Sequence, residues 1–321
     1  MQSVGNPWMW GGFIALIVAL LALDLGIFHK KDKIVSAREA MSWVVVWASL
    51  ALLFDVIVGW RFGVPKAVEF LTGYLIELSL SVDNLFVFVI VFATFRIPAH
   101  LQHRVLFWGI LTALILRGAM IIGGTALLQR FHWLIYVFGA FLLATGLKLF
   151  FHKEEEHAPE HNLAFRVLTR VIPATPALHG NHFFTRENGR RVATPLFLCL
   201  ALIEISDVIF ALDSVPAIFG VTLDPFIVFT SNMFAILGLR SMYFAMANLI
   251  GRFEYLKTGL AAVLVFIGAK MMVSHWIHIP SLVSLAVVVL LLGSAMIFSL
   301  YKTRRLAERV PDPPSRGNAE V

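Results

Sequence analysis

The sequence contains little charge and almost no cysteine. Its single cysteine, Cys199, excludes an intramolecular disulfide and a Cys-x-x-Cys redox pair, so thiol chemistry within one chain is not expected. Charged residues make up 14% of the chain and hydrophobic residues 59%, compared with about a quarter and about half in soluble domains. No phosphate-binding P-loop motif is present, which argues against an ATP-driven pump. This composition is typical of a membrane protein with many spans.

Nine apolar segments divide the chain and predict an all-α polytopic membrane protein. The predicted spans are residues 8–28, 41–60, 68–95, 105–128, 133–151, 193–219, 226–249, 258–273 and 281–301. The first has no basic segment before it and no small-residue cleavage site after it, so we expect a retained helix rather than a signal peptide. The chain therefore divides into five parts. Residues 1–67 hold two N-terminal helices and a basic loop, and residues 68–151 form a first three-helix unit. Residues 152–193 are a polar segment, 194–274 a second three-helix unit, and 275–321 a last helix with a disordered basic tail.

Lysine and arginine are concentrated in alternate loops. One set of loops, with the C-terminal tail, holds nearly all of them, whereas the other set holds only Arg61, Lys66 and Arg130. Because cytoplasmic loops carry the excess of Lys and Arg, we predict an outside N-terminus and a cytoplasmic C-terminus. The net charge of +6 thus reflects topology and implies no nucleic-acid partner.

The polar segment 152–193 is expected on the cytoplasmic side. Asn188 and Gly189 form a turn signal that predicts a short hairpin. The run of His and Glu at 152–161 is typical of a solvated linker, and a metal-collecting arm is the alternative.

The segment 193–219 is the one around which the chain is organised. It carries Glu204, Asp207 and Asp213, although a carboxylate in hydrocarbon is costly unless it is paired, neutralised or wet. Glu204 and Asp207 are three residues apart and share one helix face. Pro216 cannot donate to the carbonyl four residues before it, so we expect the helix to kink or open beside Asp213. Acidic side chains beside freed carbonyls would suit a hard cation.

Spans three to five and six to eight resemble two copies of one unit. Three charged positions recur, at intervals of 34 and 31 residues in the first copy and 33 and 30 in the second: Asp83 with Asp207, Arg117 with Arg240, and Lys148 with Lys270. Because each unit has three helices, the second copy enters the membrane from the opposite side. This predicts an inverted repeat of the kind found in secondary transporters, with the two aspartates near the midplane.

Acids outnumber bases inside the spans. The acids are Asp24, Asp55, Glu77, Asp83, Glu204, Asp207 and Asp213, and the bases are Arg117, Lys148, Arg240 and Lys270. Structural ion pairs would absorb four of the acids, so the surplus predicts a cation or protons as partners. We expect the four bases to act as counter-charges, although Lys148 and Lys270 could instead extend to the membrane surface. Asp24 and Asp55 lie outside the repeat and are structural or access-path residues.

Span three also carries a polar stripe. Glu77, Ser81 and Asn84 lie at i, i+4 and i+7 on one helix face. Asn84 offers a neutral oxygen ligand, whereas Ser81 could bond its own backbone. An oxygen-rich set without cysteine or histidine suits Mn, Ca or Mg and disfavours Cu(I) and Zn. Spacing alone does not choose among these metals and protons.

Four segments resemble the TerC family of bacterial integral membrane proteins. They are ELSLSVDNLFVF (77–88), HFFTRENGRRVATPLFL (182–198), EISDVIFALDSVPAIFGVT (204–222) and DPFIVFTSNMFAILGLRSMYF (224–244). The length, the spans and the cytoplasmic segment are most similar to its Alx branch. Leu78 and Gly220 depart from the usual Lys and Ala without touching the acids.

The resemblance implies a protein of the bacterial inner membrane that exports Mn2+ as a transporter of the LysE type, with no permanent cofactor and no enzyme activity. The implied metal ligands are Glu77, Asp83, Asn84, Glu204, Asp207, Asp213 and Ser214. We expect alternating access with Pro216 as a gate element, driven by exchange with protons, and a homo-oligomer is compatible with this plan. One alternative is a non-transporting modulator of redox or tellurite stress, in which the acids would be paired and dry. Another is a proton-coupled carrier of an organic cation or amino acid.

Overall fold

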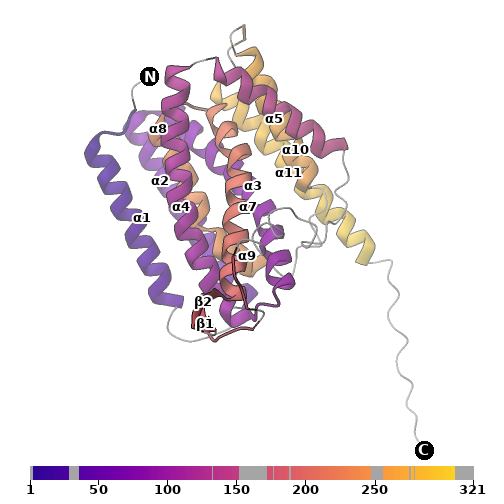
Figure 1. The fold of residues 1–321 in the computed structure, drawn as a ribbon. Helices are drawn as coiled ribbons and strands as arrows, with labels where there is room; N and C mark the ends of the chain where they lie inside the picture. Colours follow the sequence, from indigo (N-terminus) through magenta and orange to yellow (C-terminus); the bar gives the residue numbers. More distant parts are fainter. Residues whose placement is uncertain are drawn as a thin grey trace, which may run out of the picture.

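The computed structural model describes residues 3–28, 36–131, 133–151, 172–175, 177–187, 189–246, 256–274, 276–277 and 279–307. They form a bundle of helices with one small hairpin (Figure 1). The helices are α1 (Pro7–Phe28), α2 (Ala37–Phe62), α3 (Val64–Thr94), α4 (Ala99–Arg130), α5 (Leu134–Phe151), α7 (Pro195–Phe219), α8 (Pro225–Leu237), α9 (Leu239–Met246), α10 (Leu256–Val273) and α11 (Ser281–Ala307). The strands are β1 (Phe184–Glu187) and β2 (Arg190–Ala193).

The prediction of an all-α polytopic membrane protein is confirmed in its class. Within the described ranges, seven helical segments are long and apolar enough to cross a bilayer: Arg38–Phe62, Val64–Thr94, Ala99–Leu128, Leu134–Phe151, Pro195–Phe219, Pro225–Ala245 and Ser281–Ser299. Two shorter apolar helices, Pro7–Leu23 and Thr258–Val273, occupy the first and eighth predicted spans. The number nine therefore stays a prediction.

Prolines and caps set several helix starts. Pro65, Pro195 and Pro225 lie in the first turns of α3, α7 and α8, where a missing N–H costs no helical hydrogen bond. Asp224 caps α8 by accepting a hydrogen bond from the Phe226 amide at 3.0 Å. Gly63, with φ of 92°, joins α2 to α3, a backbone conformation that favours glycine.

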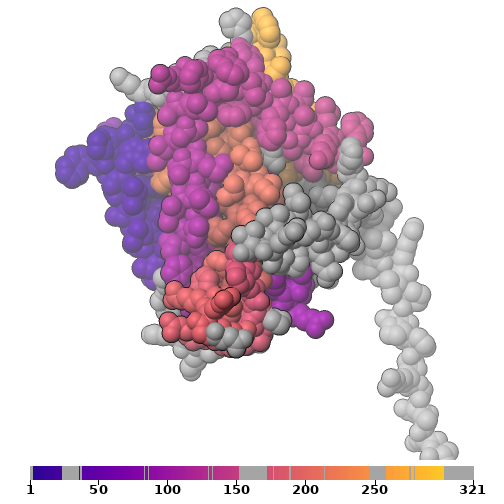
Figure 2. Space-filling model, viewed as in Figure 1, coloured from indigo at the N-terminus to yellow at the C-terminus, as the bar shows by residue number. Residues whose placement is uncertain are grey.

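The predicted hairpin in the polar segment is confirmed. Strands β1 and β2 pair antiparallel with Glu187 opposite Arg190, and Gly189 has a φ of 77° in the connection. The Thr194 hydroxyl donates to the carbonyl of His182 at 2.8 Å, and α7 begins at the next residue. Figure 2 shows the hairpin at the lower end of the bundle, below α4.

The helices divide into an inner group and a lipid-facing group. In the most apolar stretch of α8–α9 every residue is buried, whereas only 17% of the residues are buried in the most apolar stretches of α2 and α11. Large apolar side chains on those outer helices, such as Val56 and Leu290, are exposed. Helix α3 packs against α2, α7, α8 and α11, and α4 packs against α7 and α8. The inner helices α3, α4, α7 and α8 therefore surround the centre of the bundle.

Helices α5 and α10 approach closely through glycines. A Cβ atom on Gly268 would lie 2.7 Å from both the Gly139 carbonyl oxygen and the Leu143 nitrogen. A Cβ atom on Gly146 would lie 2.9 Å from the Ala261 carbonyl oxygen. In lipid, where apolar side chains gain little from leaving the solvent, such close backbone packing is a main source of helix association.

Replacing Gly268 should therefore separate these two helices. We expect Gly268→Leu to lower the thermal midpoint of the purified protein in detergent by several degrees, because the added side chain meets backbone atoms that cannot move aside. The matched control is Gly123→Leu in α4, where an added Cβ meets nothing within 4 Å. Equal midpoints for the two variants would contradict the packing argument.

Candidate cation-binding site

A group of polar side chains lies near the middle of the four inner helices. We call it the central cluster; its members are Glu77 and Asn84 on α3, Arg117 on α4, Asp207 and Ser214 on α7, and Asn232 on α8. Each member is at most 3% exposed. The helices that carry them are bonded internally along their length, so these side chains must satisfy one another rather than the backbone.

Arg117 forms the centre of the cluster. Its Nε and Nη2 atoms donate to the two carboxylate oxygens of Asp207, at 3.1 and 2.7 Å, which is a bidentate pair. Its Nη1 atom forms an ion pair with Oε1 of Glu77 and lies 3.5 Å from the Ser214 hydroxyl. One guanidinium therefore links carboxylates that come from two other helices.

Two buried amides support the carboxylates. The Asn84 Nδ2 donates to Asp207 Oδ1 at 3.0 Å, and the Asn232 Nδ2 donates to Glu77 Oε2 at 2.8 Å. In each amide the nitrogen is used by a carboxylate, which leaves the carbonyl oxygen of the same group. Both carbonyl oxygens are buried and have no hydrogen-bond partner among the described residues. The cluster therefore holds two unsatisfied acceptors, and each such buried acceptor costs about 1–3 kcal/mol.

Glu204 lies one turn before Asp207 and has a different environment. Both of its carboxylate oxygens are buried without a hydrogen-bond partner in the described part of the chain. Gly109 on α4 lies beside it, since a Cβ there would be in ordinary van der Waals contact with Oε1 of Glu204, at 3.5 Å. Glu204 and Asp207 both line a cavity of about 10 Å³, which is at the limit for one water molecule. An acid in this position requires a proton or a cation.

The structure brings together several of the predicted site residues. Glu77, Asn84, Asp207, Ser214 and Arg117 are in direct contact, and Glu204 adjoins them. The side chains of Asp24, Asp83 and Asp213 lie outside the described residues. Ser81 is buried with no hydrogen-bond partner among the described residues, so its alternative bond to its own helix is not formed.

The other predicted charges have different surroundings. Lys148 is exposed on α5, and Lys270 lines a pocket at one end of the bundle. Asp55 is half-buried on α2, with its Oδ1 atom partnerless within the described ranges. Arg240 is buried in α9.

Those predicted ligands whose side chains the structure describes do not form a ready metal site in this conformation. Among the described side chains, no three His, Cys, Asp or Glu residues are grouped closely enough to hold an ion. The guanidinium of Arg117 occupies the space between the carboxylates of Glu77 and Asp207.

Helix α7 does not open beside Asp213, and the alternative that was predicted there, a kink, stays a prediction. The helix runs without interruption from Pro195 to Phe219, three residues beyond Pro216. Pro216 and its neighbours Val215 and Ala217 are buried, so packing holds the backbone helical despite one missing hydrogen bond. The seventh predicted span is the one interrupted, at Gly238 between α8 and α9.

Asn232 is the functional candidate that sequence reasoning missed. It follows Thr230 and Ser231 in an otherwise apolar span. A polar run at membrane depth is itself a signal of function. What distinguishes Asn232 from its polar neighbours is its contact with Glu77 on another helix, which the sequence does not show.

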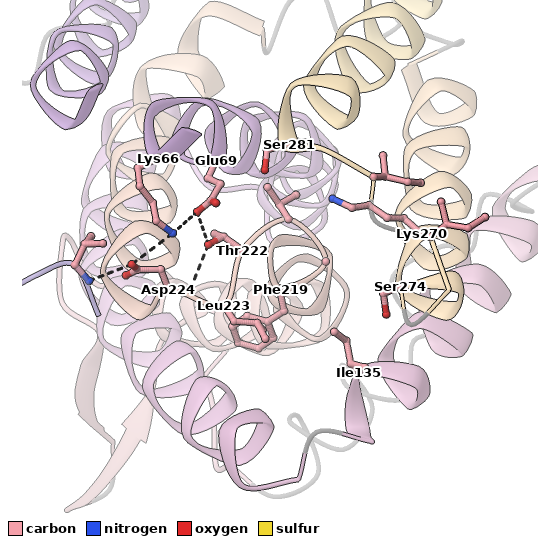
Figure 3. A pocket seen from close by; sticks show the side chains of 15 residues that line it. Lys66, Glu69, Ile135, Phe219, Thr222, Leu223, Asp224, Lys270, Ser274 and Ser281 are labelled. Atoms are coloured by element: carbon pink, nitrogen blue, oxygen red, sulfur yellow. Dashed lines mark hydrogen bonds and ion pairs between the residues drawn. The ribbon is translucent and has the colours of Figure 1, made fainter. Parts of the chain in front are cut away.

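A larger pocket lies at one end of the bundle (Figure 3). Its volume is about 570 Å³, and its polar lining includes Lys66, Glu69, Thr222, Asp224 and Lys270. The Lys66 Nζ lies 2.7 Å from Glu69 and 3.7 Å from Asp224, and the Thr222 hydroxyl donates to Glu69 at 2.6 Å. Helix α7 begins at the hairpin and ends at this pocket, so the two lie at opposite ends of the bundle.

Comparison with known proteins identifies relatives along nearly the whole chain. A model of the integral membrane protein TerC family matches residues 62–307. An uncharacterized membrane protein of Myxococcus xanthus is 57% identical, over 97% of this chain and 98% of its own length. A protein of Escherichia coli K12 named "Putative membrane-bound redox modulator Alx" is 46% identical, over 95% and 98%. No solved structure matches.

Removing the guanidinium should destabilise the centre of the bundle. We expect Arg117→Gln to cost about 3–5 kcal/mol in unfolding free energy, because it leaves two buried carboxylates without their cation. The measurement is unfolding of the purified protein in metal-free detergent. Adding Asp207→Asn should restore part of the loss. A double variant less stable than Arg117→Gln alone would contradict this account.

Proposed function

The chain belongs to the TerC family of integral membrane proteins, and we propose that it exports a divalent metal cation from the cytoplasm, with Mn2+ as the cargo. The observation that carries the proposal is a surplus of buried acid. Arg117 is shared between Glu77 and Asp207, while the adjacent Glu204 has no partner among the described residues. Carboxylates at membrane depth are expensive and are expected where an ion or a proton passes.

The chemistry of the donors favours a hard cation. The central cluster offers carboxylate, amide and hydroxyl oxygens, and its described members include no sulfur or imidazole. Such a set suits Mn, Ca or Mg. The choice of Mn2+ among these rests on the family resemblance of the motifs at 77–88 and 204–222.

The helix packing is compatible with the predicted inverted repeat. The first helix of each predicted copy, α3 or α7, packs against the second helix of the other copy, α8 or α4. The third helices, α5 and α10, pack against each other. In this proposal the nine spans place the N-terminus outside and the C-terminus in the cytoplasm, and two halves of this kind support alternating access around a midplane site.

The pocket at the end of α7 would then face outward. Its walls come from segments that the charge rule places outside, including the start of α3 and the α7–α8 connection. We assign it as the vestibule into which cargo is released. Exchange with protons would use the same acids, above all the unpaired Glu204.

The second candidate function is a membrane modulator that transports nothing. Glu77 and Asp207 are paired and dry in this conformation, as that hypothesis expects, and some relatives carry the name of a redox modulator. A dithiol mechanism within one chain is excluded, because Cys199 is the single cysteine. Such a modulator would act through an exposed surface such as the arginines of the hairpin.

The test is manganese export by cells that lack their own exporter. After loading with MnCl2, total manganese is measured in cells that express the parent, Glu204→Gln or Asp207→Asn at equal membrane levels. We expect the parent to lower manganese, and both variants to lose at least about tenfold in export rate, because a contact with a charged group is worth about 1.5–3 kcal/mol.

The matched control is Glu187→Gln on the exposed hairpin strand β1, which should export like the parent. Full export by Glu204→Gln and Asp207→Asn would mean that the site is wrong although export stands. An inactive parent would refute export, and a stress phenotype altered by Arg186→Ala or Arg190→Ala would then favour the modulator.

A further inference from the structure

The surroundings of the Arg117 guanidinium are those of a cation site. Four oxygen atoms on three side chains contact it: both carboxylate oxygens of Asp207, one of Glu77 and the hydroxyl of Ser214. They come from α3 and α7, whereas the cation comes from α4. A hard metal ion accepts this same set of oxygen ligands.

We propose that Arg117 is a tethered substitute for the cargo, and that the metal binds by displacing it. The metal would then be held by Glu77 and Asp207, together with the carbonyl oxygens of Asn84 and Asn232. This inference rests on the proposed function and adds two features to it, a competing internal cation and Asn232 as a ligand.

The two amides supply the oxygens that the metal still needs. Asn84 and Asn232 each use their nitrogen to hold one carboxylate, at 3.0 and 2.8 Å, and each keeps a buried carbonyl oxygen without a partner in the described part of the chain. That oxygen is two bonds from a nitrogen already fixed in the cluster. With Ser214, five side chains would offer oxygen to the ion, and hard cations take about six to eight such atoms.

A tethered cation explains how the empty carrier remains stable. Two dry carboxylates without a cation would be costly, and the guanidinium neutralises them when no cargo is present. The site is then competent for metal only while Arg117 is away from it. The apparent affinity for metal is therefore the affinity of the open site multiplied by the fraction of time that Arg117 is away.

A purely structural Arg117 makes the opposite prediction. If its role were only to hold α3 and α7 in place, its removal would distort the ligands and weaken metal binding. If it competes with the metal, its removal strengthens binding. The direction of the change in affinity therefore separates the two roles.

The first experiment titrates the purified full-length protein in detergent with MnCl2 and follows its thermal midpoint. We expect Arg117→Gln to bind Mn2+ about 10- to 100-fold more tightly than the parent, since its site is always competent. Mn2+ should also restore the midpoint that this variant loses, while its export rate falls. The control, Arg130→Gln at the exposed end of α4, should bind as the parent does.

Weaker or unchanged Mn2+ binding by Arg117→Gln overturns the inference. If that variant yields no folded protein, Arg117→Lys decides instead, because one ammonium cannot span both carboxylates and binding should tighten several-fold. If the parent exports manganese but these variants bind Mn2+ no more tightly, competition between Arg117 and the metal is refuted and the proposed export stands. A parent that neither binds nor exports Mn2+ refutes the proposed function as well.

The second experiment tests Asn232 as a ligand. We expect Asn232→Ala to weaken Mn2+ binding about tenfold, the loss of one contact to a charged group. Ser231→Ala is the matched control, because Ser231 is buried beside Asn232. Within the described part of the chain, its hydroxyl donates to the carbonyl of Val228 in its own helix, at 3.2 Å, and to no member of the central cluster. Equal Mn2+ affinity in the two variants would remove Asn232 from the site.

Discussion

The contact of Arg117 with two buried carboxylates is the constraint on which the centre of this bundle depends. It joins α4 to Glu77 on α3 and to Asp207 on α7, and all three side chains are nearly inaccessible to solvent. None of these helices can move away from the others without leaving a charge unpaired in a medium that cannot solvate it. Movement at this site is therefore possible only when one cation replaces another, or when a proton neutralises an acid.

The two kinds of helix contact in the bundle differ in this respect. Helices α5 and α10 meet through Gly139, Gly146 and Gly268, with backbone against backbone. The atoms nearest these glycines are backbone atoms and apolar side chains, so close fit gives this contact its strength. The contact of α4 with α3 and α7 is polar instead. Under the proposed function, the first contact stays fixed while a small cation remodels the second, as alternating access requires.

Much of the fold could be predicted from the sequence, because the membrane leaves few options. Long apolar segments must be helices, and Gly189 marks a hairpin in the polar segment. The partner of each buried charge could not be predicted, since Arg117 and Asp207 are 90 residues apart and their pairing depends on how α4 packs against α7. The sequence also left open whether α7 kinks or opens at Pro216, and the structure shows a continuous helix between buried neighbours. Asn232 was missed because a neutral amide shows its role only when its partner, Glu77, is known.

The detailed composition of the cluster separates a transport site from a structural one. Stability alone would be served by apolar side chains of similar volume, because replacing a buried ion pair in this way is often neutral or stabilising. A structural network that does use charge has to satisfy every member, since a partly satisfied one is worse than none. Here Glu204 and the carbonyl oxygens of Asn84 and Asn232 have no partner among the described residues. All of these unsatisfied atoms are acceptors, so the cluster lacks hydrogen-bond donors or positive charge. Under the proposed function, a cation that arrives from outside the chain supplies what all of them need, and this is the argument for preferring transport to a scaffold that binds no ion.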